Sequence, residues 1–191
     1  MISIPSASAS IIRKLAGIQL FLAITHGFVP VPAAAQAKSG VRVVSERDLH
    51  FGRFALSDRG YREITPAGEV FDSAIFSVPG GNPGPAQFTL SYDRGNNGRQ
   101  RLNLRFQLVF APASVTTVNG VVARLSAYQT DLPGATRVNA GQAVFVDIPN
   151  CVQRICARTF HVGGRLDITR NFGGASIAVP IPITATVISI R

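Results

Sequence analysis

The sequence predicts an all-β fold, a single antiparallel β-sandwich of about nine or ten strands. Nearly every segment alternates apolar and polar residues with a period of two, and no long stretch has the period of 3.6 that a helix requires. Loops rich in glycine, proline and asparagine separate these segments at the short spacing of sandwich strands. A sandwich fits this pattern better than a closed barrel, although the alternation alone is compatible with both.

The amino-terminal region has the pattern of an export signal. Arg13 and Lys14 form a short basic segment, and the apolar run that follows, residues 15–25, is shorter than the ~20 residues of a membrane-spanning helix. Two small-x-small motifs, the pattern that precedes a signal-peptide cleavage site, follow this run and end at Ala35 and at Ala37. We expect cleavage after Ala37, so that residues 1–37 are a signal peptide, with Ala35 as the alternative site. An uncleaved anchor is the other interpretation of this segment.

Residues 38–191 are then expected to form one domain, exported to the periplasm, the cell surface or the medium, with no membrane-spanning segment. The full chain has a formal net charge of +9 at pH 7, and removal of the signal leaves about +7. For an exported protein this charge favours anionic glycans or phosphate-rich surfaces over nucleic acid as partners. A simpler interpretation is that the charge keeps the domain soluble.

Four strands are expected in the first half of this domain, at residues 41–45, 49–56, 69–78 and 86–92. In the fourth, Ala86, Phe88 and Leu90 occupy alternate positions, which predicts one buried and one exposed face. The segments at residues 57–69 and 79–86 are expected to be loops, because glycine, proline, serine and aspartate interrupt the alternation there.

The second half begins with the clearest strand, residues 101–110, in which every even-numbered position is apolar and the odd-numbered positions up to Gln107 are polar. Asn119-Gly120 then joins two β-branched runs, which is the strongest short signal for a β-hairpin. Further strands are expected at residues 142–148 and 158–168, and Gly163-Gly164 in the latter predicts a bulge or a sharp bend.

The carboxyl-terminal segment, residues 177–191, alternates like a strand but contains Pro180 and Pro182. Residues i and i+2 of a strand direct their N–H groups to the same neighbour, so these prolines remove two donors on one side. The half of the strand that holds them is therefore expected at a sheet edge or beside a bulge. The apolar phase shifts near Val187 and Ile188, which predicts a bulge there as well.

Cys151 and Cys156 are the only cysteines of the chain. In an exported protein such a pair predicts a structural disulfide. The chain-entropy model gives about 2 kcal/mol for so short a loop, so its main effect is to clamp the local turn. A zinc or redox site is disfavoured, because the spacing is not CxxC and there is no second pair.

Four segments occur in an order that resembles a known family: LHFGRF at residues 49–54, PAQFTL at 85–90, FHVGGRLDI at 160–168 and the closing IPITATV strand. This pattern resembles the bacterial domain-of-unknown-function family numbered 4402, and is similar to the sandwiches of spore-coat-U proteins and fimbrial subunits. The resemblance implies an exported immunoglobulin-like or pilin-like fold, common in Gram-negative bacteria, and it implies no reaction. The late, local cysteine pair departs from the pattern of a chaperone–usher pilin.

The sequence indicates no catalytic site and no cofactor, so we do not expect an enzyme. It contains no G-x-S-x-G motif, and the glycine-rich loop at residues 80–84 lacks the Lys-Ser/Thr of a phosphate loop. Asp48 and His50 share one strand face and, with His161, form a candidate metal site. We favour the interpretation that these are polar residues on outward strand faces, so that no metal is bound.

Four arginines, Arg94, Arg99, Arg101 and Arg105, lie on one predicted hairpin and its outer face. Guanidinium groups bind sulfate, phosphate and carboxylate bidentately, so this arginine face is a candidate site for anionic glycans. The interpretation we favour is that the outer face of a strand needs polar residues and that arginine is the usual cation of this chain.

The sequence thus predicts a structural or interaction protein at the bacterial cell surface or in the periplasm, such as a pilus-like or coat-like subunit whose partners are other surface subunits. The alternative is a soluble module that binds anionic glycans through the arginine face. Residues 39–45 have the alternation of a donor strand for a neighbouring subunit, but we expect them to be the first strand of the domain itself.

Overall fold

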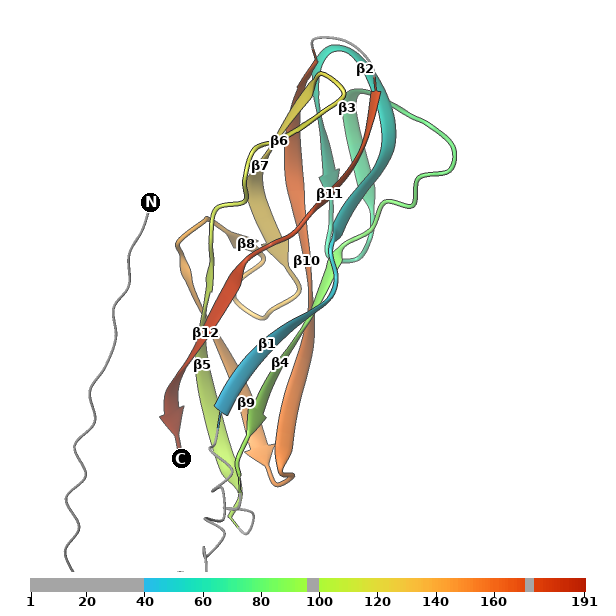
Figure 1. Cartoon of the computed structure of the whole chain (residues 1–191). Coiled ribbons are helices and arrows are strands. Elements are labelled where there is room, and N and C mark those ends of the chain that lie inside the picture. The colour runs from blue at the N-terminus through green and yellow to red at the C-terminus, as the bar shows by residue number, and fades with distance from the viewer. Residues whose placement is uncertain (1–39, 96–99, 171–173) are drawn as a thin grey trace, which may run out of the picture. The chain divides into compact units, whose positions relative to one another are not determined.

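A computed structural model describes residues 40–95, 100–170 and 174–191. The predicted signal peptide, residues 1–37, and Arg99 lie outside these residues. The described chain forms twelve strands in two antiparallel sheets and contains no helix (Figure 1), which confirms the predicted all-β class and is consistent with a sandwich. Nowhere in this part of the chain is there a helix that could cross a membrane.

The strands are, in chain order, β1 (Gly40–Arg47), β2 (Leu49–Ile64), β3 (Val70–Ser77), β4 (Ala86–Asp93), β5 (Leu102–Phe110), β6 (Thr116–Val118), β7 (Val121–Thr130), β8 (Arg137–Val138), β9 (Ala143–Cys151), β10 (Ile155–Arg170), β11 (Gly174–Val179) and β12 (Ile183–Ile190). The larger sheet has the order β1-β4-β10-β2-β11, with β3 added to β2 and β7 added to β10. β7 in turn pairs with the short strands β6 and β8. The smaller sheet has the order β12-β5-β9.

Two strands of sixteen residues, β2 and β10, organise the larger sheet. The first half of β10 pairs with β4 as far as Val162, and its second half pairs with β2 from Gly164 onward. β7 accompanies the second half of β10 on the opposite side. The pair Gly163-Gly164 therefore marks a change of partner, and the nearest register shift lies just beyond it, between Arg165 and Leu166.

Close backbone contact explains why glycines occupy this position. A Cβ on Gly163 would lie 2.0 Å from the carbonyl oxygen of Ile64, and a Cβ on Gly164 would lie 2.6 Å from that of Ala127. Real Cβ atoms do not approach other heavy atoms below 3.0 Å. The two glycines thus allow β2, β7 and β10 to meet at one level of the sheet.

The core lies between the two sheets and includes residues of both. Alternate residues of β4 and β5 are buried, as their sequence patterns predict. Aromatic contacts join the sheets, since the ring centroids of Tyr92 in β4 and Phe106 in β5 are 6.1 Å apart, and those of Phe110 in β5 and Tyr128 in β7 are 5.6 Å apart. The Tyr128 hydroxyl donates to the carbonyl oxygen of Ala111 at 2.7 Å, and burial raises the pKa of Tyr128 above its ordinary value of 10.0.

The prediction of a loop at residues 57–69 is wrong for most of this segment, because β2 continues to Ile64. This extension has partners on both sides: Tyr61–Ile64 pair with β3, and residues 59–64 pair with β10. A register shift between Leu56 and Tyr61 accommodates the intervening polar residues. Pairing within the sheet thus overrides the turn propensity of the segment, as is common for strands.

Two other predictions for local structure are confirmed. Asn119 and Gly120 connect β6 to β7 with φ angles of 49° and 73°, and two successive positive φ angles are what a type I′ hairpin turn requires. β1 pairs with β4 from Gly40 to Arg47, so this segment is the first strand of the domain itself.

Pro180 and Pro182 lie between β11 and β12, where the chain leaves the larger sheet and enters the smaller one (Figure 1). The single strand predicted at residues 177–191, with its proline-containing half at a sheet edge or beside a bulge, is therefore two strands, each at an edge of its own sheet. Proline suits the connection because it has no N–H group to contribute to a ladder. The bulge predicted near residues 187–188 is confirmed by a register shift between Val187 and Ser189.

Candidate functional site

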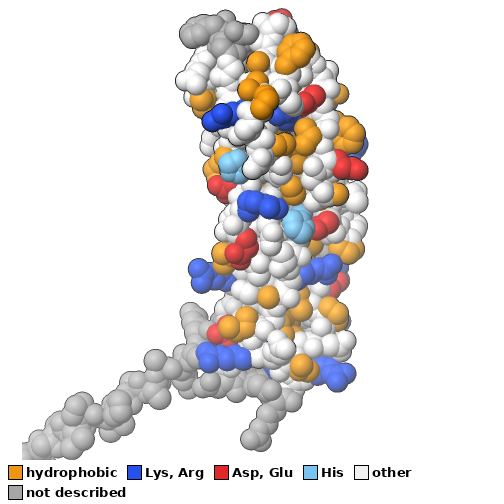
Figure 2. All heavy atoms as spheres, turned by 90° about the vertical axis from the view of Figure 1, so that its right-hand side faces the viewer, with side chains coloured by type: hydrophobic (Ala, Val, Ile, Leu, Met, Phe, Trp, Pro, Cys, Tyr) orange, Lys and Arg blue, Asp and Glu red, His pale blue; other side chains and the backbone are white. Residues whose placement is uncertain are grey.

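Exposed apolar side chains gather on β3 and the residue that follows it. Val70, Phe71, Phe76 and Val78, here called the β3 patch, are 36%, 53%, 68% and 41% exposed. β3 pairs with β2 alone among the described strands, so none of them covers its other edge. Figure 2 shows the side of the molecule that carries β2 and β3, where hydrophobic side chains lie among charged ones. Exposed aromatic residues beside an open strand edge are typical of a protein–protein contact.

The backbone of β3 is irregular, which limits how another strand can add to it. Ala74 has a φ of 55°, and the register between β2 and β3 shifts at this level. β3 is thereby divided into two short segments, residues 70–73 and 75–77. A short and kinked edge resists the addition of a long strand. The β3 patch is therefore suited to contacts made by side chains.

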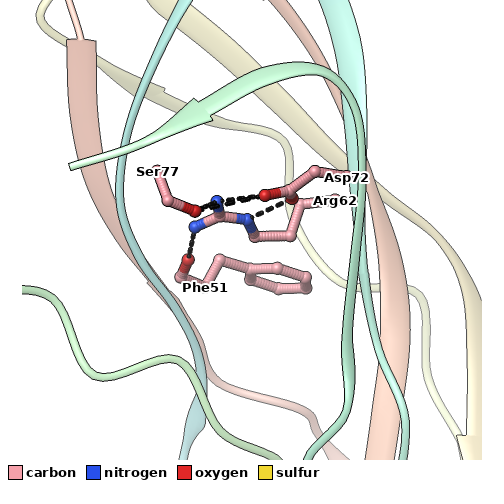
Figure 3. A network of polar contacts seen from close by, with 4 residues as sticks. All are labelled: Phe51, Arg62, Asp72 and Ser77. Atoms are coloured by element: carbon pink, nitrogen blue, oxygen red, sulfur yellow. Dashed lines mark hydrogen bonds and ion pairs between the residues drawn. The ribbon is translucent and has the colours of Figure 1, made fainter.

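A buried arginine fastens β3 to both halves of β2 (Figure 3). Arg62 is 1% exposed, and it donates from Nε to Oδ1 of Asp72 at 2.6 Å and from Nη2 to Oδ2 at 2.7 Å. Its Nη1 donates to the carbonyl oxygen of Phe51 at 2.7 Å, and Nη2 also donates to Ser77 Oγ. Phe51 lies near the start of β2 and Arg62 near its end, while Asp72 and Ser77 belong to β3. This charge-assisted network holds in place the strand that carries the β3 patch.

A second feature lies on the outer face formed by β2, β10 and β7. Its lining includes Arg59, Tyr61, Arg124 and Arg165 around a depression of about 500 Å³, here called the outer-face depression. The guanidinium carbon of Arg165 lies 3.7 Å from the ring centroid of Tyr61. Arg165 Nε also donates to Asp167 Oδ1 at 2.9 Å. The cation–π contact and the ion pair together hold Arg165 in one orientation.

Cys151 and Cys156 form a disulfide, which closes the turn between β9 and β10. Arg94, one of the four arginines of the predicted face, is 2% exposed beside this turn. Its Nη1 donates to the carbonyl oxygen of Cys151 at 3.0 Å, and Nη2 donates to that of Gln100. Its backbone N–H donates to the carbonyl oxygen of Arg154 at 2.9 Å. Arg94 therefore ties β4 to the disulfide turn and is not exposed to a ligand.

The other described members of the predicted arginine face, Arg101 and Arg105, are exposed. Arg105 is exposed on β5, but its Nε lies 3.7 Å from Asp147 Oδ1 and its guanidinium carbon lies 5.1 Å from the centroid of the Phe145 ring. Arg101 is exposed, and Arg99 lies outside the described residues. The predicted hairpin does not form, because β4 belongs to the larger sheet and β5 to the smaller one. The structure thus separates Arg94, buried at the end of β4, from the exposed Arg101 and Arg105 at β5.

Asp93, at the end of β4, stabilises the same turn. Its Oδ1 accepts hydrogen bonds from the backbone N–H of Gly95 at 2.8 Å and from Arg154 Nε at 3.4 Å. These bonds lower the pKa of Asp93 below its ordinary value of 3.8, and the bond from Gly95 has the largest effect. The ionised carboxylate therefore stabilises the fold at neutral pH, and this contribution is lost as the pH falls through the lowered pKa.

The residues of the candidate metal site do not converge. His161 Nδ1 lies 2.8 Å from Asp131 Oδ2, and the His161 backbone N–H donates to Oδ1 of the same carboxylate at 2.8 Å. His50 pairs instead through its backbone with Gly84. Over residues 40–95, 100–170 and 174–191, no group of three or more His, Cys, Asp or Glu side chains could hold a metal ion.

Tyr61 and Arg62 were not among the residues predicted to form a site, because both fall in a segment predicted to be a loop. The sequence carried no signal for them, because Tyr61, Arg62, Glu63 and Ile64 alternate in burial but not between apolar and polar residue types. The stacking of Arg165 on Tyr61 had no sequence signal either. It arises from the pairing of β2 with β10, which are far apart in the sequence.

Comparison with known proteins identifies one family. No curated protein and no solved structure matches the chain. The model of the family described as "Domain of unknown function (DUF4402)" matches residues 41–184, from β1 into β12 and thus across both sheets. The further similarity to spore-coat-U proteins and fimbrial subunits stays a prediction. Because the match covers most of the sequence, the chain belongs to the DUF4402 family of unknown function.

Proposed function

We propose that this protein is an exported structural or interaction protein of the Gram-negative cell surface or periplasm, a pilus-like or coat-like subunit. The observation that carries the proposal is the β3 patch, in which two exposed phenylalanines lie beside a strand edge that no described strand covers. The signal pattern of residues 1–37 and the disulfide support export, because disulfides persist in oxidising compartments.

The partner we propose for the β3 patch is a second copy of the chain. In a two-fold arrangement each patch contacts the same patch of its neighbour, so the end of one β3 lies against the beginning of the other. Exposed Glu69 precedes the patch, and exposed Arg53 lies at its end, where the Val78 N–H donates to the Arg53 carbonyl oxygen at 3.1 Å. An antiparallel pair would bring Glu69 of each copy toward Arg53 of the other. Opposite charges would thus flank the apolar contact, which favours this pairing.

The test is the molar mass of the exported protein as its concentration is raised. The full chain is produced in a bacterial periplasm, and its intact mass identifies cleavage after Ala37 or Ala35. Light scattering should then show reversible self-association. The double variant Phe71→Ser with Phe76→Ser should abolish it, because aromatic anchors provide most of the energy of such contacts.

The matched control is Phe145→Ser, which removes a similarly exposed phenylalanine (49%) from β9 in the other sheet. We expect this variant to associate like the unchanged protein, and thermal melts of all variants verify that they are folded. A monomer at every concentration would overturn the proposed assembly. Equal loss of association in the control would show that the β3 patch is not the contact.

A further inference from the structure

We propose that the outer-face depression binds an acidic saccharide, whose carboxylate or sulfate group is held by Arg124 and Arg165. This site is distinct from the β3 patch, so it does not depend on the assembly proposed above. It is also distinct from the arginine face predicted at residues 94–105, where Arg94 is buried.

Arg165 is held in place before any ligand arrives. Its guanidinium lies on the ring of Tyr61 at 3.7 Å, and its Nε is hydrogen-bonded to Asp167 at 2.9 Å. The side chain nevertheless stays exposed, and its Nη1 and Nη2 have no partner among the described residues. Because the stacking and the ion pair restrict the side chain, an oxyanion can bind both Nη groups with little further loss of conformational freedom.

Strand register places Arg124 on the same face of the sheet as Arg165. Asp167 of β10 is paired with Arg124 of β7 on one side and with Tyr61 of β2 on the other. Positions two apart on a strand share a face, so Arg165 points to the same side of the sheet as these residues. Arg124 is exposed and forms no ion pair within the described part of the chain. Both guanidinium groups line the outer-face depression, that of Arg165 over Tyr61 on the β2 side of β10 and that of Arg124 on the β7 side, so an anion held by both would lie across β10.

The charge of the depression favours an anionic ligand. Arg59 adds a third guanidinium to the lining. It lies on β2 opposite Thr169 of β10. Its contact with Asp58, at 3.9 Å between two exposed side chains, is too weak to neutralise it. Asp167 is the single acidic residue of the described lining, so three positive charges stand against one negative charge.

The remaining lining suits the ring of a sugar. Exposed Val115 and its neighbour Val122 provide an apolar surface beside the arginines. A sugar ring has an apolar C–H face and a polar rim, so it can lie on the valines while an attached acidic group reaches the guanidinium groups. A volume of about 500 Å³ lies within the range of small-ligand sites. An acidic saccharide meets both requirements, and an exported cationic protein meets such polymers.

The experiment is calorimetric titration of the exported protein with oligogalacturonate and with its fully methyl-esterified counterpart of the same length. We expect the acid to bind and the neutral ester not to bind. Arg124→Ala and Arg165→Ala should each weaken binding about tenfold, because each removes a charge-assisted hydrogen bond. Tyr61→Ala should also weaken binding, whereas Tyr61→Phe should retain it, because the phenylalanine ring preserves the stacking under Arg165.

The matched control is Arg101→Ala, which removes an exposed arginine outside the depression and should bind like the unchanged protein. Equal weakening by Arg101→Ala would show attraction by net charge alone and would overturn the site. Binding of the methyl ester, or binding of anionic lipid vesicles without binding of the oligosaccharide, would overturn the ligand class. The variant Phe71→Ser with Phe76→Ser should bind the saccharide normally, which separates this proposal from the assembly.

Discussion

At the scale of single residues, Arg62 shows how the fold accommodates a charge in its interior. A buried guanidinium is costly unless its donors are paired, and here a carboxylate, a backbone carbonyl and a hydroxyl accept from it. The Phe54 ring adds a contact, with its centroid 5.5 Å from the guanidinium carbon. Such a network requires one arrangement of β3 on β2, so we expect it to specify how these strands pack.

Replacement of Arg62 by methionine should lower the free energy of unfolding by about 3 kcal/mol, because it leaves the carboxylate of Asp72 without its partner. Arg59→Met is the matched control, since its ion pair is exposed and 3.9 Å long, and it should change stability by less than about 0.5 kcal/mol. Guanidinium denaturation curves measure both values. Combining Arg62→Met with Asp72→Leu should recover part of the loss, and equal losses for the two arginines would contradict this account.

At the scale of elements, β10 is the strand on which the larger sheet depends. It passes from β4 to β2 on one side while β7 covers its second half on the other. Where β10 changes partner, the backbones of β2, β7 and β10 approach one another at the same level of the sheet. This approach is possible only where β10 has no side chain. Gly163 therefore affects the pairing of several strands at once.

Gly163→Ala should lower stability by about 3 kcal/mol, because the new Cβ would overlap the carbonyl oxygen of Ile64 and force β2 away from β10. Gly84→Ala is the matched control, since no atom lies within 4 Å of the Cβ it would add and its φ is not positive. That variant should stay within about 0.5 kcal/mol of the unchanged protein. The melting temperatures of the two variants measure this difference. Similar values would show that the close approach of Gly163 to the Ile64 carbonyl oxygen is not required.

At the scale of the whole described domain, β5 connects the two sheets through aromatic contacts at its middle and at its carboxyl end. Phe106 meets Tyr92 of β4, and Phe110 meets Tyr128 of β7. The smaller sheet therefore packs on both halves of the larger one, and one cluster of buried residues includes them all. A shared core of this kind couples the unfolding of its parts.

We expect residues 38–191 to unfold in a single transition. Tyrosine fluorescence is a suitable probe, because the chain has no tryptophan and three tyrosines, of which Tyr92 and Tyr128 are buried between the sheets. The midpoint in denaturant measured by fluorescence should coincide with the midpoint measured by far-ultraviolet circular dichroism. Two separate midpoints would mean that the smaller sheet unfolds independently.

Several of these features could be predicted from the sequence because they depend on neighbouring residues. The alternation in β4 and β5 identified their buried faces, Asn119-Gly120 identified the hairpin, and the phase shift near Val187 identified a bulge. The candidate sites could not be predicted in the same way. β3 was expected as a strand, but Phe71 and Phe76 are exposed because its register with β2 places them opposite Glu63 and Ala55, which are not buried. Local sequence specifies neither this register, which shifts within β3, nor which strand lies at an edge.

The sequence by itself determined the all-β class, the approximate strands, the turn chemistry and the cysteine pair, since side-chain alternation and turn propensity act over a few residues. Only the tertiary structure decided that β2 continues through its polar segment, that Pro180 and Pro182 connect two edge strands, and that Arg94 is buried while Arg165 stacks on Tyr61. Each of these depends on strands that are distant in the chain and adjacent in space, where pairing and burial outweigh local propensity.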